Sequence, residues 1–298
     1  MERRRMYDRI LLAVDGSDEA ERAARRGLEF ARVFDATVDV LHVVEQRAVK
    51  LATTAQKERL RERGTAVLER IEAVASDIGH PVTTAMREGK PSAQISDYAT
   101  DRDASLIVIG RQGLTGVGKR LLGGVTERLL RRSDVPVFVV PKAAPDETGD
   151  YSDVLVPTDG SEIAADAARH GAAVGRRYDS TVHVLNVVDL QAAGGAFNAG
   201  GLDREFVGRL EADGESIVED VATEIDGAAP DVTTAVVRTT SFGGVAAGVR
   251  EYVDENDIDL IVMGARGRSN LGRQVLGSVT SALLRTVEIP VLAVTRSS

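Results

Sequence analysis

The chain has 298 residues, enough for two domains of ordinary size that each bury a core of their own. Its net charge of −9 at pH 7 argues against a general surface for nucleic acid or another polyanion. Cysteine is absent, which excludes disulfides, thiolate metal sites and cysteine nucleophiles, and suits a cytoplasmic protein.

The first predicted elements alternate between short β-branched runs and longer amphipathic stretches. Between Ser17 and Phe34, apolar residues at helical spacing predict a helix with Ser17 at its N-cap. The near-continuously apolar runs are typical of strands covered on both faces, and they predict strands over residues 8–14, 36–44, 82–87, 105–110 and 135–140. This alternation predicts a doubly wound α/β sheet of parallel strands, whose ligands bind beyond the carboxyl ends of the strands.

The second half of the chain repeats the first at the length of a domain. Residues 11–17 return within 154–161, residues 40–45 as 184–189, and residues 135–140 as 289–294. The polar segment 142–150 contains proline and glycine and is typical of a linker. We therefore expect two tandem domains, over residues 1–143 and 150–298.

A spaced glycine pattern in the second copy predicts a binding site. Gly264, Gly267, Gly277 and Ser278 form the pattern G-x-x-G-x9-G-S directly after the apolar run 260–263. Glycines at a strand exit let the backbone turn tightly and approach a ligand. A hydroxyl that opens the next helix can join exposed N–H groups in holding a phosphate. A lone glycine would more often serve a turn or tight packing, but the full pattern favours a phosphate cradle.

The first copy carries an altered version of this pattern. Gly110, Gly113 and Gly123 keep the spacing, but Gly124 stands where the second copy has Ser278. A hydrogen bond to a charged group contributes about 1.5–3 kcal/mol, so its loss weakens binding roughly ten- to a hundredfold. Lys119, Gly116, Gly118 and the N–H of Gly124 could partly compensate, so we expect the first domain to bind nucleotide, but more weakly than the second.

On these residues, the chain resembles the universal stress protein family over essentially its whole length, as two tandem domains. The resemblance is carried by the glycine pattern with Val279 and Thr280, by the opening segment 156–161, and by the closing segment 289–291. It implies an adenine-nucleotide α-hydrolase-like fold with five parallel strands in each domain. It also implies binding of ATP (or ADP or AMP), and pairing through the last strand, as an intramolecular pseudo-dimer or as a homodimer of tandem chains.

The resemblance also implies which residues contact the nucleotide. It places Asp159 at the ribose or at a phosphate-bound Mg²⁺, and Pro157 and Val187 beside the adenine. The implied set in the second domain is Pro157, Thr158, Asp159, Val187, Met263, Gly264, Gly267, Arg268, Gly277, Ser278, Val279 and Thr280. The corresponding set in the first domain is Ala13, Asp15, Val43, Gly110, Gly113, Gly123, Gly124, Val125 and Thr126, with Asp15 as the equivalent metal ligand.

Several of these residues also have a simpler structural interpretation. Asp159 could belong to a turn and helix cap, and Thr280 could bond a backbone carbonyl. Arg266, Arg268 and Arg273 could offset phosphate charge or lie solvated at the surface. The insertion at residues 190–201 could fold over the nucleotide as a lid or form an ordinary loop.

Nothing in the sequence indicates catalysis. The four histidines are scattered, we expect His42 and His183 to be packed or surface side chains, and the P-loop pattern G-x-x-x-x-G-K-[ST] is absent. We therefore expect a non-catalytic, nucleotide-binding regulatory module of the stress response. A slow Mg-dependent ATPase and a nucleotide-free interaction protein of the same fold are the alternatives.

Two further expectations come from composition. No apolar stretch approaches the roughly 18 residues that cross a bilayer, and the basic first residues lead into no apolar signal region. We expect neither a membrane segment nor an export signal. Abundant acidic residues with much arginine and little lysine resemble proteins of salt-loving organisms, although a GC-rich genome also favours arginine.

Overall fold

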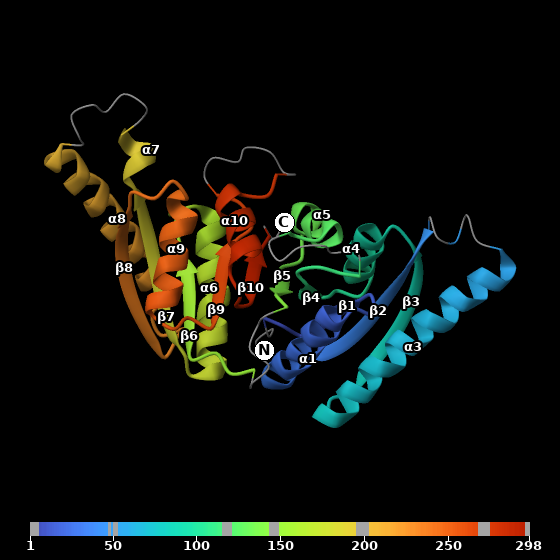
Figure 1. The fold of residues 1–298 in the computed structure, drawn as a ribbon. Helices are drawn as coiled ribbons and strands as arrows, with labels where there is room; N and C mark the ends of the chain where they lie inside the picture. The colour runs from blue at the N-terminus through green and yellow to red at the C-terminus, as the bar shows by residue number, and fades with distance from the viewer. Residues whose placement is uncertain are drawn as a thin grey trace. The chain divides into compact units, whose positions relative to one another are not determined.

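The computed structural model describes residues 6–46, 49, 53–114, 121–142, 149–194, 203–267 and 275–295. The chain divides into two compact units, one built mainly on residues up to Gly149 and the other on Asp150–Val287 with Val291–Val294. Each unit packs helices against a sheet of parallel strands (Figure 1). The predicted fold class, two tandem doubly wound α/β domains with parallel sheets, is confirmed.

The first domain contains the five strands that the sequence predicts. They are β1 (Arg9–Val14), β2 (Thr37–Glu45), β3 (Val82–Gly89), β4 (Leu106–Gly110) and β5 (Val137–Val140), in the sheet order β3-β2-β1-β4-β5. Each strand begins and ends within two residues of its predicted bounds. The helices are α1 (Asp18–Phe34), α3 (Thr54–Ile78), α4 (Pro91–Asp101) and α5 (Gly124–Arg132).

The second domain repeats this arrangement. Its strands are β6 (Asp153–Pro157), β7 (Thr181–Asp189), β8 (Asp231–Thr239), β9 (Leu260–Gly264) and β10 (Val291–Val294), in the order β8-β7-β6-β9-β10. Its helices are α6 (Glu162–Tyr178), α7 (Leu190–Gly194), α8 (Arg204–Ile225), α9 (Gly244–Glu255) and α10 (Ser278–Thr286). In both domains the chain goes to one side of the first strand and then to the other. This topological switch point lies between β1 and β4, and between β6 and β9.

The first helix of each domain begins where the sequence predicts, because a serine caps it. The Ser17 hydroxyl accepts a hydrogen bond from the Ala20 N–H at 3.1 Å, and the Ser161 hydroxyl accepts one from the Ala164 N–H at 3.3 Å. Each cap satisfies one of the N–H groups that have no partner inside the helix. The apolar face predicted for residues 17–34 is buried against the sheet.

The central strands form the core, and the edge strands differ from them. Every residue of β4 and of β5 is buried, as expected for strands covered on both faces. The expectation of a fully covered strand is wrong for residues 82–87, since β3 is half exposed along most of its length. It lies at the edge of the sheet, so polar residues such as Thr83 and Arg87 are tolerated there.

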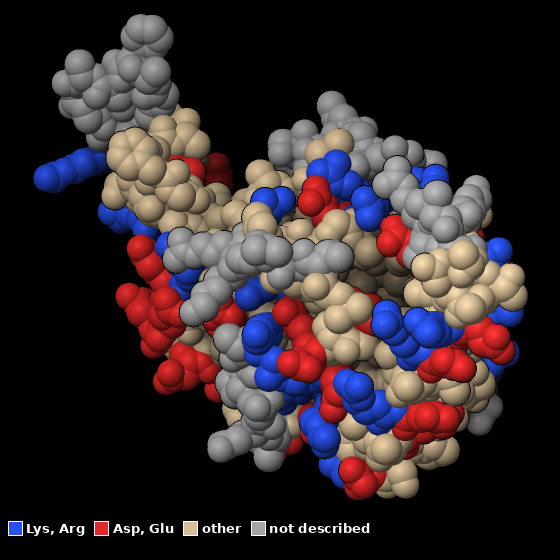
Figure 2. Space-filling model, turned by 45° about the vertical axis from the view of Figure 1, so that its right-hand side comes forward, with Lys and Arg blue, Asp and Glu red and all other residues tan. Residues whose placement is uncertain are grey.

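Charged side chains of both signs are mixed over the visible surface. Figure 2 shows basic and acidic residues interspersed on that face, with no continuous basic area among the described residues. This distribution agrees with the net charge of −9. Within the described part of the chain, no helix combines the length and the apolar character that crossing a membrane requires.

Candidate functional site

Each domain has a cavity beyond the carboxyl ends of its central strands. The cavity of the first domain has a volume of about 510 Å³ and receives residues from the ends of β1, β2 and β4. The cavity of the second domain has a volume of about 380 Å³ and receives residues from the ends of β6, β7 and β9. Both lie at the topological switch point, where parallel α/β sheets bind ligands.

The structure brings the residues predicted for each site together. The second cavity is lined by Pro157, Thr158, Asp159, Val187, Met263, Gly264, Gly267, Gly277, Ser278, Val279 and Thr280. Arg268 and Arg273 lie outside the described residues, whereas Arg266 lines this cavity. The first cavity is lined by Ala13, Asp15, Val43, Gly110, Gly113, Gly123, Gly124, Val125 and Thr126.

The aspartate after the first strand holds the turn that follows it. In the second domain, Asp159 Oδ1 accepts a hydrogen bond from the Ser161 N–H at 3.1 Å. In the first domain, Asp15 Oδ1 accepts one from the Ser17 N–H at 2.9 Å. The structural interpretation of this aspartate is therefore confirmed. One oxygen of each carboxylate is engaged by the turn, and both carboxylates line their cavities.

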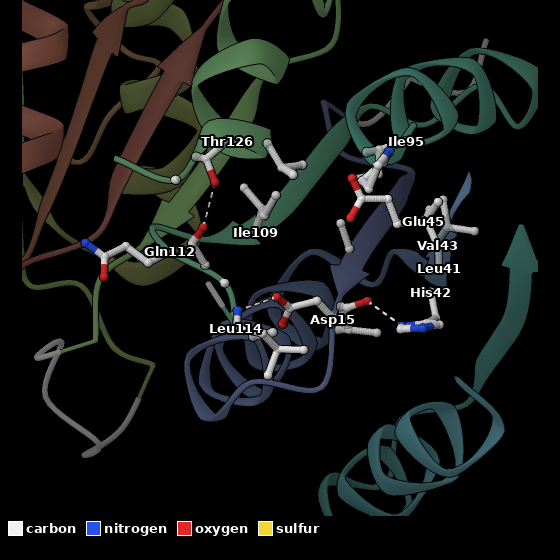
Figure 3. Close-up of a pocket in the computed structure, with 18 of the residues that line it drawn as sticks. Asp15, Leu41, His42, Val43, Glu45, Ile95, Ile109, Gln112, Leu114 and Thr126 are labelled. Atoms are coloured by element: carbon white, nitrogen blue, oxygen red, sulfur yellow. Dashed lines mark hydrogen bonds between the residues drawn. The ribbon is translucent and has the colours of Figure 1, made fainter. Parts of the chain in front are cut away.

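The second oxygen of this carboxylate explains why the middle residue of the pattern is glycine. A Cβ atom on Gly113 would lie 2.2 Å from Asp15 Oδ2, and one on Gly267 would lie 2.8 Å from Asp159 Oδ2. In the first domain, Asp15 Oδ2 also accepts a hydrogen bond from the Leu114 N–H at 2.9 Å (Figure 3). Only glycine leaves room for the carboxylate at this place, so the aspartate and the glycine loop form one unit.

The outer glycines allow close backbone packing at the strand exit. A Cβ atom on Gly264 would lie 3.0 Å from both the Arg266 carbonyl oxygen and Ile163 Cγ2. The Gly277 N–H donates to the Ala265 carbonyl at 2.9 Å, which closes the loop onto the start of α10. A side chain at either glycine would push the loop away from the sheet.

The threonine hydroxyl of each site donates a hydrogen bond to the protein backbone. The Thr280 hydroxyl donates to the Gly264 carbonyl at 2.9 Å, and the Thr126 hydroxyl donates to the Gly110 carbonyl at 3.0 Å (Figure 3). Both threonines are buried. The alternative interpretation of Thr280, a bond to a backbone carbonyl, is confirmed. This bond ties the first turn of the helix to the end of the strand, and the hydroxyl hydrogen is not available to a ligand.

The helices that follow the glycine loops begin without a side-chain cap. Gly277 is the N-cap of α10, Gly123 is the N-cap of α5, and neither helix has a side-chain hydrogen bond at its start. The first intrahelical bond of α10 runs from the Ser281 N–H to the Gly277 carbonyl at 2.8 Å. The N–H groups of Ser278 and Val279 precede it and have no carbonyl within the helix. Both residues line the cavity, so the positive end of the helix opens onto it.

A polar residue on the second strand was not predicted for either site. Asn186 Nδ2 donates to the Thr158 carbonyl at 2.9 Å, and at the equivalent position His42 Nδ1 lies 3.0 Å from the Val14 carbonyl. Because a carbonyl accepts only, His42 carries its hydrogen on Nδ1. Both residues line their cavities, and His42 is a packed side chain as expected. The available signal for these two residues was in the sequence, where each is a polar residue at the same position of an otherwise apolar run.

The walls contributed by other helices had no local signal in the sequence. Ile217 of α8 and Val245 and Val249 of α9 line the second cavity. Val67 of α3 and Ile95 of α4 line the first. These residues belong to ordinary amphipathic helices, and only the packing of the helices on the sheet brings them to the site.

The insertion after β7 is only partly described. Residues 190–194 form α7, and residues 195–201 lie outside the described residues. Leu190 and Gln191 line a separate shallow hollow together with Arg204, Glu211 and Arg238. The described residues of the insertion do not line the cavity at the ends of β6, β7 and β9.

Comparisons with known proteins agree with this architecture. The model of the universal stress protein family matches residues 6–141 and again 150–295. A universal stress protein of Methanocaldococcus jannaschii is 35% identical over 142 residues, which cover 46% of this chain and 84% of that protein. One from Mycolicibacterium smegmatis is 26% identical and is matched over 96% of both chains.

A solved structure shows the same fold over nearly the whole chain. The crystal structure of a universal stress protein from Archaeoglobus fulgidus covers 98% of both chains with a TM-score of 0.73 at 20% identity. At this identity the likeness shows the fold alone, whereas the family match covers both halves of the sequence. The chain therefore belongs to the universal stress protein family, with two family domains in tandem.

Proposed function

We propose that the second domain binds an adenine nucleotide, and that the chain acts as a regulatory module of the stress response rather than as an enzyme. The observation that carries this proposal is the uncapped start of α10. Its free N–H groups open onto a cavity that also contains the Ser278 hydroxyl and the Asp159 carboxylate. A phosphate would satisfy N–H groups that no side chain among the described residues caps.

The remaining walls suit the other parts of a nucleotide. Pro157, Val187 and Met263 offer an apolar slot for the adenine ring, as the family resemblance implies. Asp159 stands just beyond the end of β6 and lines the cavity, where a carboxylate can accept from ribose hydroxyls. Arg266 also lines the cavity and would offset part of the phosphate charge.

Magnesium would enter this site with the nucleotide. Within the described ranges, no group of three or more His, Cys, Asp or Glu side chains is placed to hold a metal ion. Mg²⁺ is commonly bound by one or two carboxylates together with phosphate oxygens and water. Asp159 fits the role of that carboxylate in the second domain, and Asp15 occupies the equivalent place in the first. Bound Mg²⁺ would neutralise phosphate charge.

Occupancy gives this module its regulatory action. A ligand that binds one conformation of the protein better than another shifts the population toward it. A partner protein would then read the surface beside the cavity. Slow hydrolysis of bound Mg-ATP would be the enzymatic alternative, since it needs only a positioned water. Pairing of the two domains, association of two chains and a cytoplasmic location stay predictions from the resemblance and the composition.

The proposal is tested by substituting Ser278→Ala, alone and together with Gly277→Val. Loss of the hydroxyl should weaken Mg-ATP binding roughly tenfold or more, because a bond to a charged group is lost. The double variant should abolish binding, since a side chain at Gly277 crowds the Ala265 carbonyl, which lies 3.3 Å from a Cβ there. Calorimetric titration measures the affinity, and circular dichroism checks that the fold is retained.

Adenosine provides the matched control ligand. If Ser278 contacts the phosphates, the Ser278→Ala substitution should leave adenosine binding nearly unchanged while it weakens ATP binding. Equal ATP affinity in the wild type and the double variant would refute the assignment. Phosphate release that tracks the purified protein and disappears in Asp159→Ala would instead indicate the slow ATPase.

A further inference from the structure

We propose that the cavity of the first domain binds an uncharged, mainly apolar ligand, so that the two domains hold chemically different molecules. This inference concerns the cavity that the nucleotide proposal does not use, and it goes beyond that proposal. The two cavities share one backbone framework, because the aspartate, the three glycines and the threonine occupy equivalent places in both. Differences in ligand chemistry must therefore come from the side chains that vary on this framework.

The first difference is the loss of groups that favour an anion. Gln112 occupies the place of Arg266, and Gly124 occupies the place of Ser278. The Gln112 N–H donates to Glu19 Oε1 at 2.8 Å, and its side-chain amide donates to the Leu121 carbonyl. The backbone N–H and one hydrogen of the side-chain amide are therefore engaged within the protein.

The charged side chains near the glycine loop also differ between the two domains. Glu19 stands where the second domain has Ile163, and burial raises the pKa of its carboxyl, while the Gln112 N–H and the Arg111 guanidinium oppose that shift. Arg111 is itself buried and offsets the charge of Glu19 behind the loop. Glu45 lines the cavity in addition to Asp15, against the single cation Arg63 among the described lining residues. Among the described lining residues, an anionic tail would therefore meet two carboxylates and one cation.

The second difference is an apolar mouth. Leu114 is 71% exposed and Leu121 is 52% exposed, and both line the cavity. The Leu114 N–H donates to Asp15 Oδ2, and the Leu121 carbonyl accepts from the Gln112 side-chain amide. These hydrogen bonds hold the backbone of both leucines. When a ligand covers large apolar side chains that are exposed to water beside a cavity, the free energy of the system falls. In the sequence, Arg268 occupies the place of Leu114, so the second domain has a cation at that position.

The third difference is the apolar wall that continues from this mouth. Leu41, Val43, Ile95 and Ile109 face the cavity from two strands and a helix (Figure 3). Leu60, one helical turn before Gly64 of α3, adds to this wall, whereas the second cavity has no lining residue at the equivalent Leu210. A volume of about 510 Å³ is in the range that holds a small organic molecule.

His42 is the polar side chain that would orient such a ligand. In the tautomer that donates from Nδ1 to the Val14 carbonyl, the His42 ring has Nε2 as an acceptor. His42 and Glu45 both line the cavity. A neutral ligand with one hydroxyl or amine would satisfy this acceptor and place its apolar body against Ile95 and Leu114.

A pair of fluorescent probes tests the chemical class. N-phenyl-1-naphthylamine is neutral, and 8-anilinonaphthalene-1-sulfonate has the same rings with an anionic group. The wild-type chain should bind the neutral probe at one saturable site, at least about tenfold more tightly than the sulfonate. Absence of saturable binding of the neutral probe, or equal affinity for the two probes, would overturn the proposal.

Matched variants assign each ligand to its cavity. Val43→Trp fills the first cavity, and Val187→Trp fills the second at the equivalent position. Val43→Trp should abolish binding of the neutral probe and leave one Mg-ATP per chain. Val187→Trp should abolish Mg-ATP binding and leave binding of the neutral probe unchanged. Thermal unfolding checks that both variants fold, because such dyes also bind partly folded proteins. Two ATP per chain in the wild type, with one lost in Val43→Trp, would show that the first cavity is a nucleotide site instead.

A conversion variant tests the inference without filling the cavity. Gln112→Arg with Leu114→Arg and Gly124→Ser installs the side chains of the second domain. The serine has room, since the nearest atom to a Cβ on Gly124 lies at 3.5 Å, on Arg128. This variant should gain a second ATP site and bind the neutral probe at least about tenfold more weakly. If both the ATP stoichiometry and the probe affinity stay unchanged, these three positions do not determine which ligand the cavity binds. Because Val187→Trp measures the second cavity separately, failure here is distinguishable from failure of the nucleotide proposal.

Discussion

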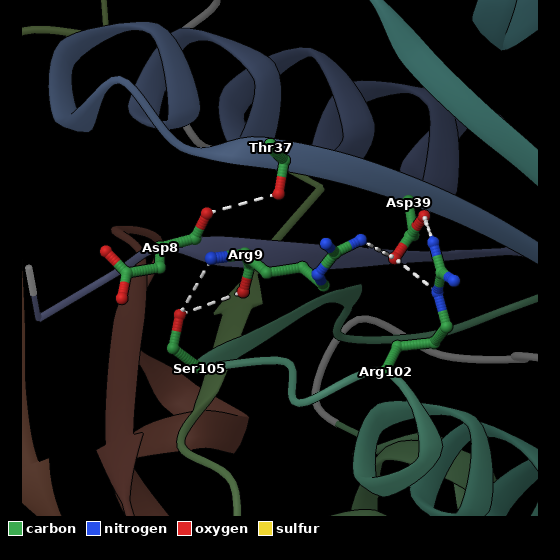
Figure 4. A network of polar contacts seen from close by, with 6 residues as sticks. All are labelled: Asp8, Arg9, Thr37, Asp39, Arg102 and Ser105. Atoms are coloured by element: carbon green, nitrogen blue, oxygen red, sulfur yellow. Dashed lines mark hydrogen bonds and ion pairs between the residues drawn. The ribbon is translucent and has the colours of Figure 1, made fainter.

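At the scale of single residues, the two domains give the polar side chain at one position of the second strand different partners. Buried Asp39 of β2 lies 3.1 Å from the Arg9 guanidinium and 3.3 Å from that of Arg102 (Figure 4). At the equivalent place in the second domain, His183 Nε2 lies 2.9 Å from Asp153 Oδ1, and its Nδ1 lies 3.0 Å from the Tyr252 hydroxyl. A polar group taken out of water needs a hydrogen-bond partner, and each domain supplies one from different residues. The His183 side chain is 12% exposed and hydrogen-bonded, within the expectation of a packed or surface residue.

Another histidine of the second domain makes stability depend on pH. Burial lowers the pKa of His170, on α6, from 6.5 to about 4, while Asp166 opposes this shift and Arg169 adds to it. Between these values the unfolded chain binds a proton that the folded domain does not, so stability falls as the pH drops through this window. We expect this ring to lower the free energy of unfolding by roughly 1–3 kcal/mol between pH 7 and pH 4.

Urea unfolding at several pH values measures this effect. His170→Gln should flatten the pH profile, whereas the same substitution at His80, in the turn after α3, should leave it as in the wild type. A profile that does not change in His170→Gln would contradict the assignment.

At the scale of elements, glycine sets how closely the first helix approaches the sheet. A Cβ atom on Gly27 of α1 would lie 2.5 Å from Leu12 Cδ2, and one on Gly171 of α6 would lie 2.5 Å from Val156 Cγ2. The neighbouring side chains are fully buried and have no free space to move into. Glycine at these two positions is therefore required for the helix to pack this closely on the sheet, although it lowers the intrinsic helix propensity.

Alanine substitutions separate the effects of packing and propensity. Gly27→Ala should destabilise the first domain by roughly 1–2 kcal/mol, because overpacking costs more than the gain in helix propensity. Gly208→Ala on α8 is the matched control, since no atom lies within 4 Å of a Cβ there, and it should stabilise by about 0.5–1 kcal/mol. Denaturant midpoints measure both changes, and a stabilising Gly27→Ala would refute this account of the packing.

At the scale of the whole molecule, the net charge of −9 predicts a dependence on salt. Raising KCl from about 0.1 M to about 1 M shortens the Debye length from ~10 Å to ~3 Å and screens the repulsion among acidic residues. If the acidic, arginine-rich composition is an adaptation to salt, the Tm should rise over this range. The measurement is thermal unfolding across a KCl series, with sucrose at matched osmolality as the control. A flat or falling Tm would favour the explanation from genome composition.

The sequence by itself determined the elements and the local parts of the site. Strand bounds, the serine caps at Ser17 and Ser161, and the glycine pattern all follow from periodicity and backbone geometry within short segments. The repeat then assigned each site residue of one domain a counterpart in the other. These signals are local, so no three-dimensional information was needed to read them.

The tertiary structure alone decided what those residues do. Asp15 and Leu114 are 99 positions apart, and their bond shows that the middle glycine makes room for a carboxylate. The hydrogen bond of Thr280, the position of Asn186 and the wall formed by Ile217 likewise come from segments distant in the chain. Such contacts depend on how helices dock onto the sheet, and the free energy of that docking is spread over many buried apolar contacts, none of which is a local motif in the sequence.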